Sequence, residues 1–458
     1  FNMGKAVFSV CNFGAVPNSN ENQSRNIQAA IDACFKSGGG EVVIPAGDYA
    51  VGDIRLRSGV YIHLLGNAHL IGTRNPNDYF NYRYDKLEPL DSKYVTDDLW
   101  QSPQTPNRNY SFMRTAGSRW NNGIIRGIFA ENCGVIGDKG SYIDGSNCYD
   151  ENNEEQYRGP HGISLWYCKN IMLKGYTVQN SGNWAHAMHY CENITADNIT
   201  VLAGHDGIHP TCCKNVIITN SSFYTGDDCI AGFGNLNIYV GNCILNSACS
   251  ALRLGAANAL IEKCRIYGPC KYYFRGSLTK EEKISGKPPK SDGKRNNMLS
   301  VFTYYSDFAF PVEYQPGNIV VSDCSIDFAD RLLHYNFSGN ETWQKNRPLS
   351  SFAFKNITAT NISMPLTCYG DESDKINLEI SDSVISFREG YENVTFMHAN
   401  NYKKIHLKNL EIKNNISEPF ILSWQTKDAI EFENVISDSH KNKLTVYRTD
   451  APFECESI

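Results

Sequence analysis

The sequence predicts an all-β fold: a single right-handed parallel β-helix with a short N-terminal capping helix. Two observations indicate it: short apolar runs that alternate in twos, and an asparagine that returns about every 22 residues. A unit of this length buries its apolar face only by stacking on its neighbours, so the repeat predicts a solenoid. The recurring asparagines are Asn170, Asn193, Asn215, Asn237 and Asn258, which lie 23, 22, 22 and 21 residues apart.

Other repeat architectures fit the pattern less well. Leucine-rich repeats place leucine at fixed offsets, and helical repeats carry an apolar stripe with a period of about 3.6 residues. The asparagines predict either a ladder of side-chain amides along the coils or simply a turn at each position. Cysteines two residues before several of them, namely Cys168, Cys191 and Cys213, predict thiols stacked in the core.

The segment of about residues 1–50 is expected to close the N-terminal end of the solenoid. Ser24 is placed to cap a helix that carries Ile27, Ile31 and Cys34 on one face and ends at the glycines of 38–40. A short amphipathic helix of this kind covers strand edges that an open solenoid end would expose.

We expect one domain over residues 1–458, with two segments that break the repeat at about 80–120 and 272–300. The second contains Lys280–Arg295, which is rich in lysine, glycine and proline. It is interpreted as a mobile loop, either a plain surface insertion or a basic lid over a cleft. Both segments are candidates for walls that close the ends of a cleft.

Composition narrows the partners and the location. The net charge of −6 over 458 residues gives no field that would attract nucleic acid or an anionic membrane. No apolar run reaches the roughly 18–20 residues of a membrane span. Sixteen cysteines, several at predicted core positions, favour a reducing, cytoplasmic location. The alternative is a secreted or periplasmic protein whose signal peptide has been removed, and the oligomeric state is left open.

Three aspartates give the strongest indication of chemistry. Asp206 lies 21 residues before Asp227 and 22 before Asp228, so coils of this length stack all three on adjacent turns. Carboxylates this close repel one another, which raises at least one pKa and suits a proton donor beside a general base. Turn-capping aspartates and a calcium cluster are the alternatives.

From about residue 7 to 270 the sequence resembles glycoside hydrolase family 28, the polygalacturonase family of the pectin-lyase-like β-helix superfamily. The resemblance includes Asn12–Ala15 and Gly38–Gly47 near the N-terminus, then Ile143–Gly145, Arg158–Pro160 and Asn180–Trp184. It implies the same fold that the repeat predicts.

The resemblance also assigns roles to the aspartates. The family motif Asn-Thr-Asp-Gly-x-Asp, followed by an Asp pair, is matched by Asp206 and by Asp227–Asp228. It implies that Asp227 is the general acid and that Asp206 and Asp228 position and deprotonate a water. The family inverts the anomeric configuration, which implies about 6.5–9.5 Å between the acid and base carboxyl groups.

The sequence departs from the family at several positions. His205 replaces the family threonine, and His209 replaces the second aspartate of the motif. The family's Gly-His-Gly becomes Cys249–Ala251, with Ser250 in the middle. Its Arg-Ile-Lys, which grips the substrate carboxylate, is best matched by Arg275–Ser277, which lacks the lysine. Arg253 is a second candidate, because an arginine can hold a carboxylate through two hydrogen bonds.

We therefore expect an inverting hydrolase of α-linked uronic-acid-type, galacturonide-like or related plant-glycan oligosaccharides, acting from chain ends and needing no metal or cofactor. Two other classes stay open. One is a calcium-dependent polysaccharide lyase on the same fold, and the other is a non-catalytic glycan-binding solenoid. The residues expected to contact the sugar are His205, His209, Arg253, Arg275, Trp184, His189 and Ser250.

Overall fold

The computed structural model describes residues 6–79, 122–153, 157–285, 294–306, 313–338, 343–345, 347–424, 429–437 and 446–449. The predicted excursion at 80–120 lies outside these ranges. The chain divides into two compact units. The first comprises Phe1–Gly226, Tyr272–Lys294 and Ala309–Pro311, and the second comprises Asp227–Lys271, Arg295–Phe308 and Val312–Ile458. The single domain expected over 1–458 stays a prediction.

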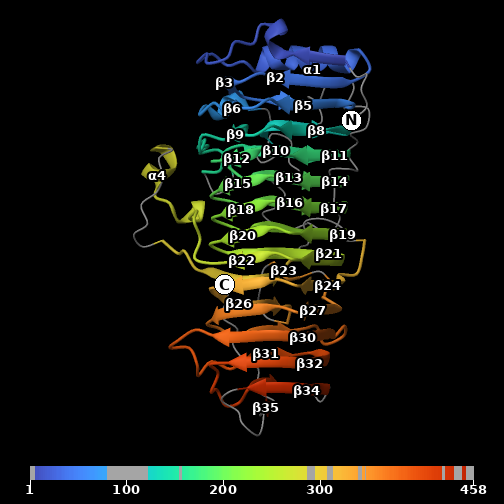
Figure 1. Cartoon of the computed structure of the whole chain (residues 1–458), viewed down its shortest axis with the longest axis vertical. Coiled ribbons are helices and arrows are strands. Elements are labelled where there is room, and N and C mark those ends of the chain that lie inside the picture. The colour runs from blue at the N-terminus through green and yellow to red at the C-terminus, as the bar shows by residue number, and fades with distance from the viewer. Residues whose placement is uncertain are drawn as a thin grey trace. The chain divides into compact units, whose positions relative to one another are not determined.

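The first unit is a right-handed parallel β-helix, as predicted. In Figure 1 its strands β10, β13 and β16 follow one another in successive coils, with β11, β14 and β17 beside them. The strands are β1 (Ala6–Ser9), β2 (Gly40–Ile44), β3 (Gly47–Val51), β4 (Ile54–Arg55), β5 (Val60–Leu64), β6 (Ala68–Gly72), β7 (Gly123–Ile128), β8 (Glu131–Gly137), β9 (Tyr142–Asp144), β10 (His161–Trp166), β11 (Lys169–Lys174), β12 (Thr177–Gln179), β13 (His186–His189), β14 (Glu192–Asp197), β15 (Thr200–Ala203), β16 (Ile208–Thr211), β17 (Lys214–Thr219) and β18 (Ser222–Thr225).

The second unit is built in the same way. Its described pairings are all parallel and join strands one coil apart. Its strands are β19 (Ile230–Gly241), β20 (Ile244–Ser247), β21 (Ser250–Glu262), β22 (Arg265–Tyr267), β23 (Met298–Tyr304), β24 (Gly317–Ser322), β25 (Ser325–Asp327), β26 (Ala329–Asn336), β27 (Ser351–Lys355), β28 (Thr358–Ile362), β29 (Leu366–Tyr369), β30 (Ile376–Phe387), β31 (Met397–Asn400), β32 (Tyr402–Lys413), β33 (Ile421–Trp424), β34 (Ala429–Ser437) and β35 (Val446–Thr449).

The register of the strands explains the repeat in the sequence. Ile194 of β14 lies opposite Val216 of β17, and the offset of 22 residues is one coil. Both side chains are fully buried, while their neighbours in the strand face outward, so alternation places one apolar row inside. The predicted period is therefore confirmed as the length of one coil.

The predicted asparagine ladder is present. In the first unit the Nδ2 of Asn193 donates to the Oδ1 of Asn170 at 2.9 Å, and Asn215 donates to Asn193 at 2.9 Å. In the second unit Asn258 donates to Asn237 at 3.2 Å. Each of these residues has a φ between 55° and 62°, a left-handed conformation that asparagine tolerates better than most residues. The left-handed backbone and the hydrogen bonds between side-chain amides therefore both favour asparagine at these positions.

The predicted core thiols are also present. Cys168, Cys191 and Cys213 lie at the same point of successive coils and are at most 1% exposed. Burial raises the pKa of the Cys168 and Cys191 thiols well above the usual value. The cysteines among the described residues are free thiols, which suits their role as small apolar core residues.

The capping helix is α1 (Ser24–Lys36), with Ile27, Ile31 and Cys34 on its buried face as predicted. The predicted cap is wrong. Gln23 precedes the helix, and the Oγ of Ser24 instead accepts the N–H of Gly52 at 2.6 Å, which ties the helix to the following strands. Among the described residues, no helix is long and apolar enough to span a membrane.

The mobile loop predicted over Lys280–Arg295 stays a prediction, although part of the segment after residue 271 is helical. This segment contains the 3-10 turn η7 (Arg275–Ser277) and the helix α4 (Lys280–Ser285). Both belong to the first unit, although the strands on either side of them in sequence belong to the second. Residues 286–293 lie outside the described part of the chain.

Candidate active site

The turn between β15 and β16 carries the first carboxylate. The Oδ2 of Asp206 lies 2.7 Å from the Nδ1 of His209, which is the second residue of β16. Asp206 is 4% exposed and His209 is 3% exposed, so the pair is largely removed from water. A hydrogen bond donated by an imidazole favours the ionised form of a carboxylate. The sequence predicted both residues in the site but not the bond between them.

Aromatic rings hold the neighbouring imidazoles. Trp184 stacks on His209 with ring centroids 3.7 Å apart and planes 10° apart. His189 stacks on Trp166 at 4.2 Å. Burial lowers the pKa of His189 well below its usual value, and charge on His209 or His161 lowers it further, so His189 is neutral. Sugar contact by Trp184 and His189 stays a prediction, because both are more than nine-tenths buried.

His205 lies fully buried in the same turn. Its ring centroid is 6.1 Å from that of Tyr157 and 6.2 Å from that of Phe274, which it meets edge-on. Burial lowers the pKa of His205 well below its usual value, and the cations Arg158 and Arg275 lower it further. The ring is therefore a neutral imidazole in the wall beside Asp206. Its predicted contact with the sugar remains a prediction.

Arg275 anchors the segment 272–285 to the first unit. Its Nη1 donates to the Oδ1 of Asn147 at 2.8 Å, and its Nη2 donates to the carbonyl oxygens of Asn147 and Cys148 at 3.2 Å. The residue is 1% exposed, and burial lowers its pKa to about 10, so it stays cationic at neutral pH. These hydrogen bonds anchor the segment through Arg275. That Arg275 binds a substrate carboxylate stays a prediction.

In the second unit, the turn before β19 carries the aspartate pair. Asp228 is 2% exposed, and its Oδ1 accepts the backbone N–H of Ser250 at 2.9 Å. Its Oδ2 lies 3.7 Å from the Nη1 of Arg253. A backbone donor and a cation both favour the ionised carboxylate. The Oγ of Ser247 donates to the carbonyl oxygen of Asp227 at 2.6 Å and fixes the turn.

Two aromatic rings flank Arg253. Its guanidinium lies 5.0 Å from the ring centroid of Tyr305 and 5.3 Å from that of Trp343. Burial alone would lower the pKa of Arg253, but Asp228, Tyr305, Cys249 and Asp227 together outweigh that effect, and the pKa is raised overall. The side chain keeps 22% of its surface exposed, so part of this cation still faces solvent.

One group of potential metal ligands occurs among the described residues. Ligand atoms of Asp227, Asp228 and Cys249 lie within 4.8 Å of one another. Burial raises the pKa of Cys249 well above its usual value, and the two carboxylates raise it further, so the thiol keeps its proton. Calcium prefers roughly six to eight oxygen ligands, and Arg253 already supplies positive charge to Asp228. The donor set therefore fits a calcium site poorly.

The two parts of the candidate site belong to different units: Asp206 to the first, Asp227 and Asp228 to the second. The predicted stacking of Asp206 on this pair, and its distance from Asp227, thus remain predictions. Carboxylate atoms of Asp227 and Asp228 lie within 4.8 Å of each other, closer than the roughly 6.5–9.5 Å expected between an inverting acid and base. The expected sugar contacts did not include Tyr305 and Trp343, which lie 52 and 90 residues after Arg253. No repeat spacing links these positions, so the sequence carried no signal for them.

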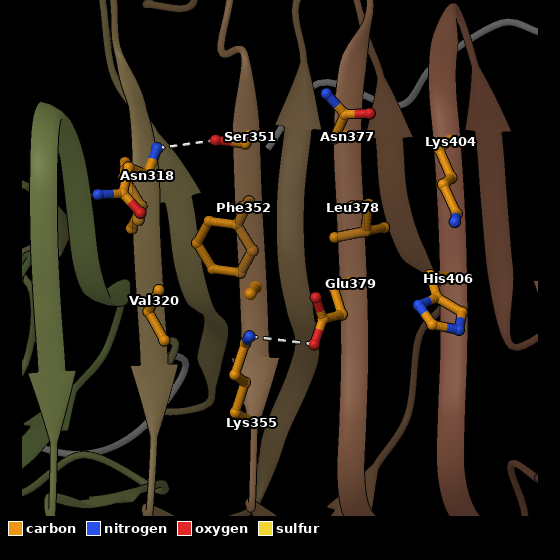
Figure 2. Close-up of a pocket in the computed structure, with 12 residues that line it drawn as sticks. Asn318, Val320, Ser351, Phe352, Lys355, Asn377, Leu378, Glu379, Lys404 and His406 are labelled. Carbon is orange, nitrogen blue, oxygen red and sulfur yellow. Dashed lines mark hydrogen bonds and ion pairs between the residues drawn. The ribbon is translucent and has the colours of Figure 1, made fainter. Parts of the chain in front are cut away.

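A separate groove of about 290 Å³ crosses the outer face of β24, β27, β30 and β32 (Figure 2). Lys355 and Glu379 pair across it at 3.1 Å, and Lys404 at its edge pairs with Glu431 at 2.8 Å. Glu379 is the one carboxylate among the residues that line it. The groove therefore lacks the two carboxyl groups that glycoside hydrolysis uses.

Comparison with known proteins supports the resemblance. Residues 34–248 match the family model described as Glycosyl hydrolases family 28. A probable polygalacturonase of Vitis vinifera is 26% identical over 235 residues, which is 49% of this chain and 43% of that protein. An exopolygalacturonase of Platanus acerifolia is 26% identical over 263 residues, 55% of this chain and 60% of that protein. The chain thus spans about half the length of these two curated relatives.

Among solved structures, a hyperthermoactive exopolygalacturonase from Thermotoga maritima matches with a TM-score of 0.60, over 90% of this chain and 92% of that chain, at 17% identity. A likeness at that identity concerns the fold, and it confirms the parallel β-helix. The family match includes Asp206, Asp227 and Asp228. Over residues 34–248, which are 215 of the 458 residues, the chain is therefore similar to glycosyl hydrolase family 28.

Proposed function

We propose that this chain is an inverting glycosidase that hydrolyses α-linked, galacturonide-like oligosaccharides, with Asp227 as general acid. Asp206 and Asp228 position and deprotonate the attacking water. The observation that carries the proposal is the surroundings of Asp228, which is almost fully buried yet meets the N–H of Ser250 and the guanidinium of Arg253. Glycoside hydrolysis needs one carboxyl group that carries a proton and one that is ionised. The family match over residues 34–248 supports the same chemistry.

The two adjacent carboxyl groups divide the acid and base roles. Asp228 carries the negative charge, because its backbone and arginine partners favour that form. Its charge favours a proton on Asp227, whose carboxyl lies within 4.8 Å. Asp227 gives this proton to the glycosidic oxygen while a carboxylate base takes one from the water that attacks the anomeric carbon. The acid ends ionised, the base ends protonated, and exchange with solvent restores both.

An acidic substrate suits the cation at Arg253. The planar guanidinium presents several N–H donors, and its Nε forms no hydrogen bond to any described residue. A guanidinium can hold a carboxylate through two parallel hydrogen bonds, so the carboxylate of a uronate is a well-matched ligand. Arg275 is 1% exposed and already donates to Asn147 and Cys148, so Arg253 is the better placed of the two arginines.

The segment 272–285 supports exo-action on short chains. Lys280 pairs with Glu151 at 3.0 Å, and the Nζ of Lys283 lies 3.6 Å from the ring centroid of Tyr157. A Cβ at Gly226 would lie 2.1 Å from the carbonyl oxygen of Tyr273, so the segment passes directly over the turn that precedes Asp227. A wall at this turn is expected to block one direction of a bound glycan. The relative from Platanus acerifolia is an exopolygalacturonase by name.

We also propose a reducing, cytoplasmic location, which the stacked free thiols of the core support. The partner is then an oligosaccharide rather than a cell-wall polymer. A calcium-dependent lyase is less favoured, because one of the three candidate ligands is a protonated thiol. A non-catalytic glycan-binding solenoid is less favoured, because simple binding does not require an ionised carboxylate beside a second carboxyl group.

The test is to incubate the protein with di- and trigalacturonides and a panel of other plant-glycan oligosaccharides, with a chelator present. We expect cleavage that resists the chelator, releases monosaccharide from the first turnover, and yields the inverted anomer in ¹H NMR spectra. A product that absorbs in the ultraviolet and forms only with calcium would indicate a lyase. Tight binding without any turnover would indicate a binding protein.

A further inference from the structure

The imidazole of His209 occupies the place of an aspartate in the family motif, and it is bonded to Asp206. The Nδ1–Oδ2 distance is 2.7 Å, and the side chains of the two residues are 4% and 6% exposed. We propose that His209 is a positioning residue: its Nδ1–H fixes the orientation of the Asp206 carboxylate for its work on the water. The inference rests on the proposed function, and it goes beyond the roles given to the three aspartates.

The ring of His209 is held in the plane that this hydrogen bond needs. Trp184 covers it at 3.7 Å with planes 10° apart. The backbone N–H of Trp184 donates to the Oδ1 of Asn183 at 3.0 Å, which fixes the backbone that carries the indole. On the adjacent strand, Ala187 lies opposite His209, and its small side chain leaves room for the stack. The imidazole is therefore preorganised rather than free to rotate.

Replacing the family aspartate by histidine changes the interaction of the Asp206 carboxylate with the side chain three residues later. A second carboxylate three residues away would repel the Asp206 charge, whereas an imidazole N–H donates to it. The bond requires a proton on Nδ1, because an ionised carboxylate only accepts. Asp206 thereby keeps one lone pair engaged and presents its other oxygen in a fixed direction.

The same chain contains a matched pair outside the candidate site. The Nδ1 of His69 lies 2.7 Å from the Oδ1 of Asp48, and its ring stacks on Tyr142 at 3.8 Å and 12°. This pair is more exposed, with 20% of the His69 side chain and 54% of the Asp48 side chain open to solvent. It reproduces the local geometry without the catalytic surroundings, so it serves as a control.

The experiment compares three variants by kcat and KM on the best oligosaccharide: His209→Leu, His209→Asn and the control His69→Leu. An asparagine side chain keeps an N–H close to the Nδ1 position, and leucine does not. Because a misplacement of about 1 Å costs on the order of a hundredfold in rate, we expect His209→Leu to lower kcat about a hundredfold with little change in KM. His209→Asn should regain about tenfold of that loss, and His69→Leu should match wild type.

A purely structural role would give a different pattern. Full activity in His209→Leu would overturn the inference, and so would equal losses in the leucine and asparagine variants when circular dichroism and Tm confirm that both are folded. Failure of the proposed function is distinguishable, because wild type would then hydrolyse no sugar of the panel. In that case the pair is tested by the ¹⁵N shift of His209: no response to Asp206→Asn would overturn the inference.

Discussion

Arg253→Met tests how much the contacts that Arg253 makes around Asp228 contribute to the free energy of unfolding. The substitution removes two cation–π contacts, at 5.0 Å to Tyr305 and 5.3 Å to Trp343, each worth about 0.5–1 kcal/mol. It also removes a partly exposed ion pair with Asp228, worth about 1 kcal/mol. The expected loss in the free energy of unfolding is therefore about 2–3 kcal/mol, which combines these contributions.

Urea unfolding followed by circular dichroism measures this loss. Arg388→Met is the matched control, because the Arg388 guanidinium also lies near two rings, at 5.1 Å from Phe328 and 5.6 Å from Tyr391. The control should lose about 1–2 kcal/mol from its two ring contacts. Arg253→Lys should fall between Arg253→Met and wild type, since lysine keeps the charge but not the planar stack. Unchanged stability in Arg253→Met would refute the reasoning.

Three further outcomes are expected. Burial lowers the pKa of His186 to about 4, so below about pH 6.5 the unfolded chain binds a proton that the folded chain does not. Stability should therefore fall from pH 6.5 towards pH 4, and a constant urea midpoint between pH 7 and 4.5 would contradict this. Cys168 and Cys191 should resist a thiol reagent until urea unfolds the chain, and rapid labelling of these thiols in the folded protein would be the contrary result. Arg275→Leu should speed proteolytic cleavage within residues 272–285 at least tenfold while Tm changes little, and wild-type cleavage rates would show that Arg275 is no anchor.

Much of the fold could be predicted because it is periodic. A coil of about 22 residues brings similar side chains to the same point of successive turns, so the recurring asparagine, joined in three coils by a cysteine, revealed the repeat. The cap of α1 could not be predicted in this way. Ser24 suits an N-cap by residue type, but its hydroxyl accepts a hydrogen bond from the backbone N–H of Gly52, just after β3. The sequence around Ser24 gives no sign of that contact.

The candidate site was predictable only where it follows the repeat or the family motif. Asp206 lies 21 and 22 residues before Asp227 and Asp228 in the sequence, which is the length of one repeat, so spacing alone drew attention to them. Tyr305 and Trp343 come from distant parts of the second unit, and their contact with Arg253 depends on how the chain folds around the coils. Contacts of this kind do not follow the repeat, so their partners cannot be predicted from spacing in a single sequence.

The central claim is that Asp227 protonates the leaving group while Asp228 acts as a base. The most direct measurement compares Asp227→Asn and Asp228→Asn on a digalacturonide and on a nitrophenyl α-galacturonide, whose leaving group needs no proton. Asp382→Asn is the control. Asp382 is an exposed residue of β30, and its carboxylate accepts a hydrogen bond from the side chain of Asn409. On the digalacturonide both catalytic variants should lose about 10²–10⁴-fold in kcat. Asp227→Asn alone should recover most of its activity on the nitrophenyl substrate. Recovery by Asp228→Asn instead, or full activity of Asp227→Asn on the digalacturonide, would contradict the account.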